Sequence, residues 1–456
     1  MCTLICYTAY DTDCRLFMSR RTLIVAVGLS LMCSSVLAGY WFIHTGAPAQ
    51  SASVASAYKT EAEEDVFVRF DMEIFDIVMR EYWQKAEEKD LAEIYRLALA
   101  KAAGTQEEKL PSADRAGTAA MLGEVFARTP EEKKKTLATD IGIIVLANLA
   151  PQGRSGLLSD NQEQQFRDAA NNIERENDLY KNLGVEADAT HEQVALAYQV
   201  KANELAASSS PQAQQELKQV EKAKEVLSDN GSRAIYDETK ILPSVVSSII
   251  STNTLYFDLS KVTPATLQEF VNTLEKSKDN PQLSGMIIDV RGNIGGTLDF
   301  AKYLLALFIG QNQYAFDLLH KGELKLERTP MVPKIASLAN FTEIVILTDG
   351  QSQSTAELTT AIFKRWRLAK VVGTKTRGWG TVENTFPMET RLSDDEKFAV
   401  LLVHSLTLRE DNEPIEGRGV DPDIDITQPD WKNQVRAMFR SVAFSEAVIQ
   451  AVGYKK

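Results

Sequence analysis

The sequence predicts an α/β core with a mixed, largely parallel sheet, preceded by a helical region and a small all-α module. Three observations indicate this class. Short apolar runs alternate with helical patterns from residue 241 to residue 430, which is typical of strands joined by helices. Residues 59–175 carry apolar side chains at helical spacing. Residues 176–240 hold two amphipathic patterns around a Ser- and Pro-containing loop, which predicts a helical hairpin.

The chain begins with an apolar segment that is long enough to cross a membrane as a helix. Residues 22–43, TLIVAVGLSLMCSSVLAGYWFI, carry no charged side chain. Arg15, Arg20 and Arg21 precede this segment, and Lys59 is the first basic residue after it. The positive-inside rule then keeps the N-terminus in the cytoplasm and places the body of the chain outside it.

A cleaved signal is the alternative to an anchor. Val36 and Ala38 resemble a small-residue cleavage site. We interpret residues 1–45 as a signal or anchor segment and the Ala- and Ser-rich residues 46–58 as a linker. Both alternatives export the remaining residues.

Charge and composition argue against several functions. The formal net charge is −13, whereas nucleic-acid binding needs clustered Lys and Arg. All four cysteines lie in or before the apolar segment, so the exported body has neither a disulfide framework nor a cysteine metal site. The four histidines lack metal-ligand spacing, and we predict no metal and no cofactor. The cysteines are Cys2, Cys6, Cys14 and Cys33.

The helical region, residues 59–175, contains an amphipathic and an apolar helix pattern. Ile74, Val78 and Trp83 recur near helical spacing in DMEIFDIVMREYW. The apolar run at residues 141–149 predicts a core helix. A break that contains Pro and Gly follows, and we expect a polar helix to resume after it.

The second module, residues 176–240, has two helical patterns joined by an SSSP loop. Leu196 and Val200 lie four residues apart on the first pattern. The same spacing continues on the second pattern, at Leu217, Val220, Ala223 and Leu227. These two stripes predict an antiparallel helical hairpin.

The core, residues 241–430, has five strand-like runs. Thr263 followed by Pro264 is a good helix start, and residues 298–309 predict another helix. A further helix begins near Ser354, and the chain ends in helices over residues 431–456. We expect the last strands to pair antiparallel. The runs are residues 255–259, 283–290, 343–349, 369–373 and 398–404.

Two loops that follow strands carry the residues that suggest chemistry. In IIDVRGNIGGTLDF, three glycines leave the backbone bare, so that N–H groups can face a negative oxygen. In VILTDGQSQSTAEL, Ser354 lies where a strand gives way to a helix N-terminus, which favours negative charge. A serine beside an amide cradle is what acyl transfer requires, although serine at this position is also a common helix N-cap. The glycines are Gly292, Gly295 and Gly296.

The order and wording of these motifs resemble the C-terminal processing (tail-specific) serine protease family. The resemblance runs from DVRGNIGG through TDGQSQSTAEL and VVGTKTRGWGTV to IEGRGVDPDI. FDIVMREYW and LAPQGRSGLLSDNQEQQF also look like the helical N-terminal part of that family. The resemblance implies a protease core with Ser354 at the place of the nucleophile. It further implies an oxyanion hole from Thr355 with Gly295 or Gly296, and it matches Glu357 to the acidic residue after the serine.

The chain departs from this family where the catalytic base should lie. The ungapped match places Trp379 at the lysine position, in GWGTV, and Arg365 at the position of a helix Asp. Indole has an N–H donor and no basic lone pair, so Trp379 cannot accept the serine proton. Losing a general base typically costs about 10²–10⁴ in rate. Lys375, Lys364 and His404 are candidate substitute bases, and the alternative for each is a solvated or structural role.

The second departure is the module at residues 176–240. The family normally has a peptide-binding PDZ domain there, and this sequence has no PDZ-like glycine loop. LYKNLGVEADATHEQVALAY and KEVLSDNGSRAIYD instead resemble a J domain. The His-Pro-Asp positions of a J domain fall on Ala206, Ala207 and Ser208. We therefore expect a degenerate J-like module that serves as a structural or protein-binding insert.

These features support two main hypotheses. The first is a tail-specific serine peptidase-like protein of the cell envelope, with an incomplete Ser–Lys dyad. The second is an inactive pseudoprotease that binds peptides or acts as a scaffold or regulator. Both imply polypeptide C-termini or unfolded exported proteins as partners, a protein partner at the J-like module, and a body in the bacterial periplasm that is anchored in the inner membrane or cleaved and soluble. An envelope co-chaperone is a third and weaker hypothesis.

Overall fold

The computed structural model describes residues 60–105, 109–173, 178–206, 208 and 210–454. The predicted signal or anchor segment and the linker, residues 1–58, lie outside the described residues. Among the residues that are described, none of the helices combines the length and apolar character needed to cross a bilayer.

The helical region has one hydrophobic core, which Phe398 and Leu402 of a later strand complete. Ile74 and Val78 are buried on one face of the longest amphipathic pattern, as their spacing predicts, and Trp83 is partly buried just after that helix. The elements are η1 (Glu61–Glu64), α2 (Val66–Glu81), α3 (Glu88–Ala103), α4 (Arg115–Arg128) and α5 (Glu131–Ala147).

The end of the helical region differs from the prediction. A short strand, β1 (Gly156–Ser159), precedes the polar helix α6 (Asp160–Asn171). β1 pairs antiparallel with β10 (Phe398–Thr407). Four residues are too few for periodicity to indicate a strand, so the long-range pairing decides this element.

The module that follows is a four-helix unit, in which the two helices on either side of the predicted loop pack together as a hairpin and two shorter helices flank them. Val194, Val220 and Leu227 are buried in its core. The apolar stripe predicted on the first of the two patterns is wrong, because Leu196 and Val200 are 63% and 59% exposed. The helix presents Val194 to the core instead, two residues out of phase with Leu196. Its helices are α7 (Leu179–Leu183), α8 (His191–Ala206), α9 (Pro211–Ser228) and α10 (Asn230–Thr239).

The core contains a six-stranded sheet with the order β11-β8-β7-β4-β3-β2. All neighbours pair parallel except β2 and β3, which are antiparallel. β4 is buried along its whole length, as expected for a central parallel strand with both faces covered. The strands are β2 (Val245–Ile250), β3 (Thr254–Leu259), β4 (Gly285–Asp289), β7 (Glu343–Thr348), β8 (Lys370–Gly373) and β11 (Ile424–Asp425).

A second, antiparallel sheet has the order β1-β10-β5-β6, and β9 also pairs with β10. The run at residues 398–404 therefore belongs to a separate sheet rather than to the edge of the parallel one. The prediction of antiparallel pairing at the end of the core is confirmed for β9 and β10. The strands not yet given are β5 (Tyr314–His320), β6 (Glu323–Arg328) and β9 (Thr381–Pro387).

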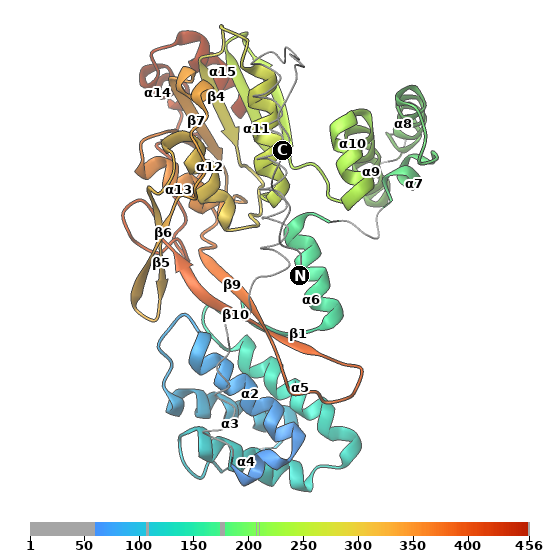
Figure 1. Cartoon of the computed structure of the whole chain (residues 1–456), viewed down its shortest axis with the longest axis vertical. Coiled ribbons are helices and arrows are strands. Elements are labelled where there is room, and N and C mark those ends of the chain that lie inside the picture. The colour runs from blue at the N-terminus through green and yellow to red at the C-terminus, as the bar shows by residue number, and fades with distance from the viewer. Residues whose placement is uncertain (1–59, 106–108, 174–177, 207, 209, 455–456) are drawn as a thin grey trace, which may run out of the picture. The chain divides into compact units, whose positions relative to one another are not determined.

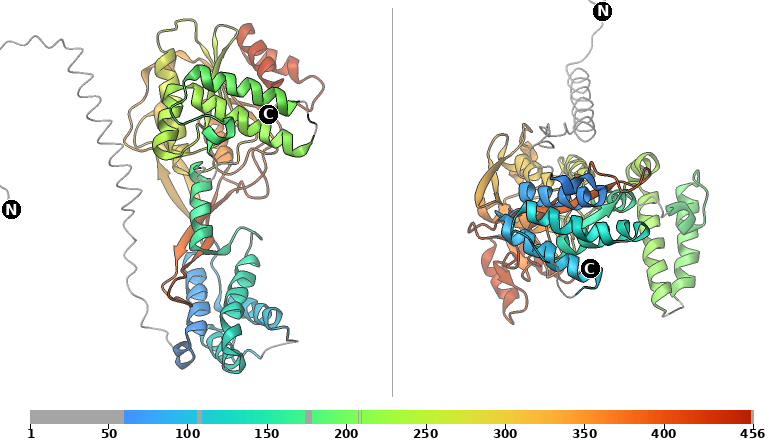
Figure 2. Two further views of the ribbon diagram at one scale, coloured as in Figure 1. Left: turned by 90° about the vertical axis from the view of Figure 1, so that its right-hand side faces the viewer. Right: turned by 90° about the horizontal axis from the view of Figure 1, so that it is seen from below.

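Helices cover the parallel sheet (Figures 1 and 2). The side chain of Thr263 caps α11, and Phe270 and Leu274 of that helix are buried against β3 and β4. The two C-terminal helices lie side by side, and Phe444 and Val448 pack on the other face of the sheet. The helices are α11 (Pro264–Ser277), α12 (Asp299–Ile309), η2 (Ala336–Asn340), α13 (Thr355–Arg365), α14 (Trp431–Met438) and α15 (Val442–Val452).

Candidate functional site

The two loops that carry the predicted site leave the parallel sheet at the same edge. β4 and β7 are parallel neighbours, with Asp289 in register with Leu347. The loop after β4 contains Gly295, and the loop after β7 leads to Ser354. Because parallel strands end at one edge, their following loops meet there, which is the usual place for a site in an α/β sheet.

Ser354 is held in a strained backbone conformation at the start of α13. Its φ is 58° and its ψ is −125°, a region that non-glycine residues rarely occupy and that is common at functional sites. Its N–H donates to Glu357 Oε2 at 2.9 Å and to the carbonyl oxygen of Trp379 at 3.1 Å. The first turn of α13 and the Trp379 loop therefore both hold the backbone of the serine.

Gly295 lies directly against Ser354. A Cβ at Gly295 would lie 2.6 Å from Ser354 Cβ and 3.0 Å from Ser354 Oγ, and the glycine φ is +85°. Both the contact and the dihedral angle exclude a side chain at this position. The glycine loop and the start of α13 thus form one pocket, as the motif order predicts.

The amides of this pocket differ in their availability. The N–H of Gly295 donates to Asn293 Oδ1 at 2.8 Å, so it is already engaged. The N–H groups of Gly296 and Thr355 donate to no acceptor among the described residues. Of the two glycines predicted for an oxyanion hole, Gly296 therefore has the free donor, and Thr355 has one at the first turn of α13.

Glu357 joins the serine helix to the Trp379 loop. Its buried carboxylate accepts hydrogen bonds from Thr376 Oγ1 at 2.5 Å and from the N–H groups of Gly378 and Trp379 at 2.7 Å each, besides that of Ser354. Burial raises the pKa of this carboxyl, although the four hydrogen bonds act in the opposite direction. The sequence matched Glu357 to an acidic family position, but its role in tying two loops together is visible only here.

Trp379 stands beside the serine and is covered by a residue that the sequence analysis missed. The guanidinium of Arg154 lies 3.2 Å from the centroid of the indole ring, a stacked cation–π arrangement. Arg154 also pairs with Glu416 at 3.1 Å. The indole N–H donates to Glu383 Oε1 at 3.4 Å. Burial raises the pKa of the Glu383 carboxyl, and burial lowers the pKa of the Arg154 guanidinium.

None of the candidate substitute bases has a hydrogen bond to Ser354 among the described residues. Lys375 is exposed and pairs with Asp421 at 3.2 Å. Lys364 donates to the carbonyl oxygen of Asp421 at 2.6 Å and pairs with Glu410. The ring of His404 stacks on that of His320. Their alternative, a solvated or structural role, is what these contacts favour.

Arg365, at the position of the family's helix Asp, is also engaged elsewhere, since it donates to Tyr314 Oη at 3.1 Å and to a backbone carbonyl. No group of three or more His, Cys, Asp or Glu side chains suited to a metal occurs in the described part of the chain.

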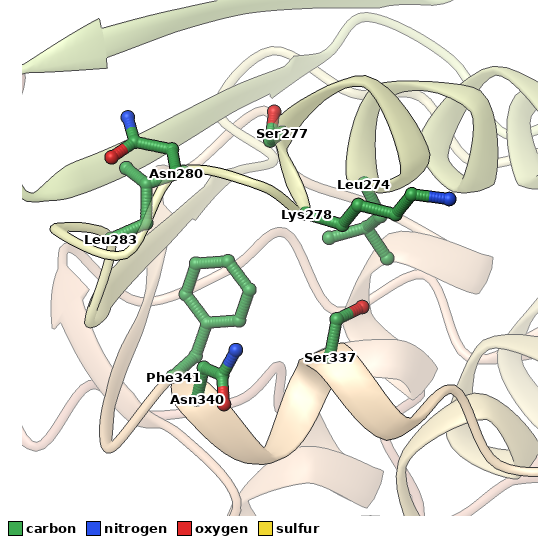
Figure 3. Close-up of a pocket in the computed structure, with 8 residues that line it drawn as sticks. All are labelled: Leu274, Ser277, Lys278, Asn280, Leu283, Ser337, Asn340 and Phe341. Atoms are coloured by element: carbon green, nitrogen blue, oxygen red, sulfur yellow. The ribbon is translucent and has the colours of Figure 1, made fainter.

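A small surface cleft lies between the end of α11 and η2 and contains none of the candidate site residues (Figure 3). It is lined by Leu274, Ser277, Lys278, Asn280, Leu283, Ser337, Asn340 and Phe341.

A strained serine at a helix start, placed beside glycine amides at the edge of a parallel sheet, defines the class of serine hydrolase-like α/β proteins. Residues 253–426 match the family model of peptidase family S41. Residues 178–237 match the DnaJ domain family, which agrees with the predicted J-like module.

Curated relatives are carboxy-terminal processing proteases. The chain is 26% identical to the Carboxy-terminal-processing protease of Bartonella bacilliformis over 36% of this chain and 36% of that protein. It is 28% identical to the Carboxy-terminal processing protease CtpB of Bacillus subtilis over 39% of this chain and 34% of that protein. The chain thus matches about a third of the length of these relatives. A solved structure titled as the photosystem II D1 C-terminal processing protease matches with a TM-score of 0.44 and 13% identity, over 79% of this chain and 93% of that one.

Proposed function

We propose that this chain binds unstructured polypeptide segments, chiefly C-terminal tails, at the Ser354 pocket and releases them uncut. The observation that carries the proposal is the make-up of the lysine position. Trp379 is covered there by Arg154 and bonded to Glu383. An indole cannot accept a proton, and arginine stays charged. Serine without a basic partner is a weak nucleophile.

The pocket retains features that suit a bound peptide. Ile294, next to Gly295 in the glycine loop, is 53% exposed and offers an apolar contact at the mouth. The free N–H groups of Gly296 and Thr355 can donate hydrogen bonds to a peptide carbonyl oxygen or to a terminal carboxylate. Binding without turnover requires only these contacts, because the energy of binding and the chemistry of cleavage are separable.

A slow serine peptidase is the second candidate, and one observation favours it. The strained conformation of Ser354 against Gly295 is preserved, and strain of about 1–3 kcal/mol persists only where the surroundings impose it. A nucleophile geometry of this kind would support cleavage if a base from the substrate or solvent took the place of the lysine.

Cleavage and binding assays on the purified full-length chain separate these candidates. The wild-type protein and a Ser354→Ala variant are incubated with an unstructured substrate that has a free C-terminus. We expect no cleavage by either protein and measurable binding of the labelled tail by both. Cleavage by the wild type that is lost in Ser354→Ala would contradict the proposal and establish the peptidase.

A matched pair of variants tests where the tail binds. Ile294→Asp places a charge at the mouth of the pocket and is expected to weaken binding about tenfold or more. Val442→Asp is the control, because Val442 is 75% exposed and begins α15. The preceding residue, Ser441, contacts Glu343 at the start of β7, whereas the candidate site follows the end of that strand. Equal weakening by both variants would place the tail elsewhere.

For the rest of the chain we propose export, with residues 22–43 as an anchor or a cleaved signal and residues 45–456 in the periplasm. The J-like module is proposed as a protein-binding insert. Ala206 and Ser208 stand where a J domain has the ends of its His-Pro-Asp loop, and Ala207 lies outside the described residues. Topology reporters fused at the C-terminus test the export, and co-purification of an ATPase with the module would argue for the co-chaperone hypothesis instead.

A further inference from the structure

Two histidines stack at the junction between the helical region and the antiparallel sheet. The rings of His320, at the end of β5, and His404, in β10, have centroids 4.3 Å apart and an interplanar angle of 17°. His320 Nδ1 donates to the carbonyl oxygen of His404 at 2.6 Å. His404 Nδ1 contacts Ser405 Oγ at 2.7 Å. Both rings are therefore fixed by their neighbours rather than mobile on the surface.

This histidine pair lies where three segments meet. β5 and β10 pair in register only at Leu406 with Leu319 and at Thr407 with Leu318. The segment after α2 joins both strands, since the N–H of Trp83 donates to the carbonyl oxygen of Val403 at 3.0 Å and the N–H of Lys321 donates to the carbonyl oxygen of Trp83 at 2.6 Å. The strand pairing beside the histidines is therefore short, and a change of charge there acts on all three segments.

The charges that face the pair are mostly positive. Lys321 and Lys325 both act on His404 and favour its neutral form. Lys321 Nζ donates to the last carbonyl oxygens of α2, those of Met79 and Arg80. Glu81 Oε2 lies 4.0 Å from His404 Nε2, but Glu81 already pairs with Arg80 at 2.7 Å. The carboxylate near His404 is therefore shared with Arg80, while both lysines act on the same imidazole.

The same strand connects the pair to the candidate site. The pairing of β9 with β10 shifts register between Val403 and Ser405, so His404 is the bulged residue. The residues opposite the bulge are Glu383 and Val382. Glu383 accepts the indole N–H of Trp379. A movement of the bulge is thus transmitted to the carboxylate that accepts the indole N–H of Trp379.

We propose that the His320–His404 stack is a pH-sensitive latch that holds the Trp379 side chain against Arg154 and Glu383 while His404 is neutral and loosens it when His404 is protonated. A cationic His404 ring is repelled by the neighbouring Lys321 and Lys325. The protonated ring would leave its stacked position, loosen the short β5–β10 pairing and shift the bulge. Such a latch would regulate the proposed tail-binding site, and it rests on that proposed function only for its biological consequence.

The direction of the pH effect follows from the burial of His404. Burial lowers the pKa of His404, and the neighbouring His320 lowers it further. The unfolded chain then binds more protons than the folded chain as the pH falls below the ordinary histidine value of about 6.5. The contribution of His404 to stability is therefore fully present above about pH 6.5 and is lost progressively as the pH falls below that value.

Tryptophan fluorescence of the full-length protein without any peptide tests the latch. The emission of Trp379 is obtained as the difference between the wild type and a Trp379→Phe variant, at pH values from 5 to 8. We expect this difference signal to change with a midpoint between about pH 5 and 6.5. The transition should be lost in His404→Gln and in His320→Gln. It should persist in the control His191→Gln, because His191 is exposed on α8.

Two results would overturn the latch. One is a wild-type difference signal that stays constant from pH 5 to 8, and this test needs no histidine variant. The other is a transition that survives unchanged in both His404→Gln and His320→Gln. Thermal unfolding gives a second measurement: between pH 7.5 and 5.5, the midpoints of wild type and His191→Gln should fall by about 2 °C or more relative to the midpoint of His404→Gln. Because neither readout involves a substrate, a failure here is distinct from a failure of the proposed tail binding.

Discussion

A lysine introduced in place of Trp379 is predicted to remain inactive as a base unless Glu383 is changed as well. The indole N–H lies 3.4 Å from Glu383 Oε1, so a lysine amine that enters this space meets a carboxylate. Two unit charges about 4 Å apart at an effective dielectric constant of about 20 attract by about 4 kcal/mol. That energy corresponds to a rise of about three units in the lysine pKa.

The neutral amine is the form that removes the serine proton, so the carboxylate suppresses the base. Even one third of the attraction raises the lysine pKa by about one unit and lowers the neutral fraction about tenfold. Arg154, which lies 3.2 Å from the indole centroid, has the opposite effect, because a neighbouring cation favours the neutral lysine. Glu383→Gln keeps the size and a hydrogen-bond acceptor while it removes the negative charge.

Initial rates of tail cleavage between pH 6 and 9.5 provide the assay. We expect Trp379→Lys to cleave at the background rate of its Ser354→Ala counterpart. The double variant Trp379→Lys with Glu383→Gln should cleave about 10²-fold faster or more, with a profile that rises towards alkaline pH. The reasoning is refuted if the single variant is as fast as the double variant, or if Ser354→Ala leaves the activity of the double variant intact.

Three further perturbations test how the fold supports the site. Gly295→Ala should lower the free energy of unfolding by about 2 kcal/mol or more, because its Cβ would meet Ser354 Cβ at 2.6 Å. The control Gly292→Ala, at a position with φ +70° and open space around it, should lower it by only about 1 kcal/mol. Equal losses of the two variants in urea denaturation would contradict the close contact. Glu357→Gln should cost about 2–3 kcal/mol, because one of its two acceptor oxygens becomes a donor that faces N–H groups, and unchanged urea stability would show that the network is dispensable. Asp71 is fully buried and neither of its oxygens has a hydrogen-bond partner among the described residues, and burial raises the pKa of its carboxyl well above the usual range. The folded form therefore holds a proton that the unfolded chain releases above about pH 3.9, so the contribution of Asp71 to stability falls as pH rises. Asp71→Asn should raise the unfolding free energy at pH 8 by about 1–3 kcal/mol, and the account is contradicted if the wild-type unfolding free energy, measured relative to that of Asp71→Asn, does not fall between pH 5 and 8.

The sequence by itself determined that the residue at position 379 cannot accept the serine proton. An indole has no basic lone pair in any fold, and the glycine loop and the serine loop both follow apolar strands in the printed order. Parallel neighbours end at one edge, so the meeting of Gly295 with Ser354 could be expected from the motif order alone.

Only the tertiary structure decided which side chains surround Trp379. Arg154 comes from the end of the helical region. Its guanidinium donates to the hydroxyl of Thr381, which lies 227 positions further along the chain. The second sheet was also decided in this way, because β1 has four residues and acquires its pairing only from β10. Helical and strand periodicities report which face of a segment is apolar. They carry no information on which distant segment supplies the neighbour, since that choice depends on packing energy summed over the whole chain.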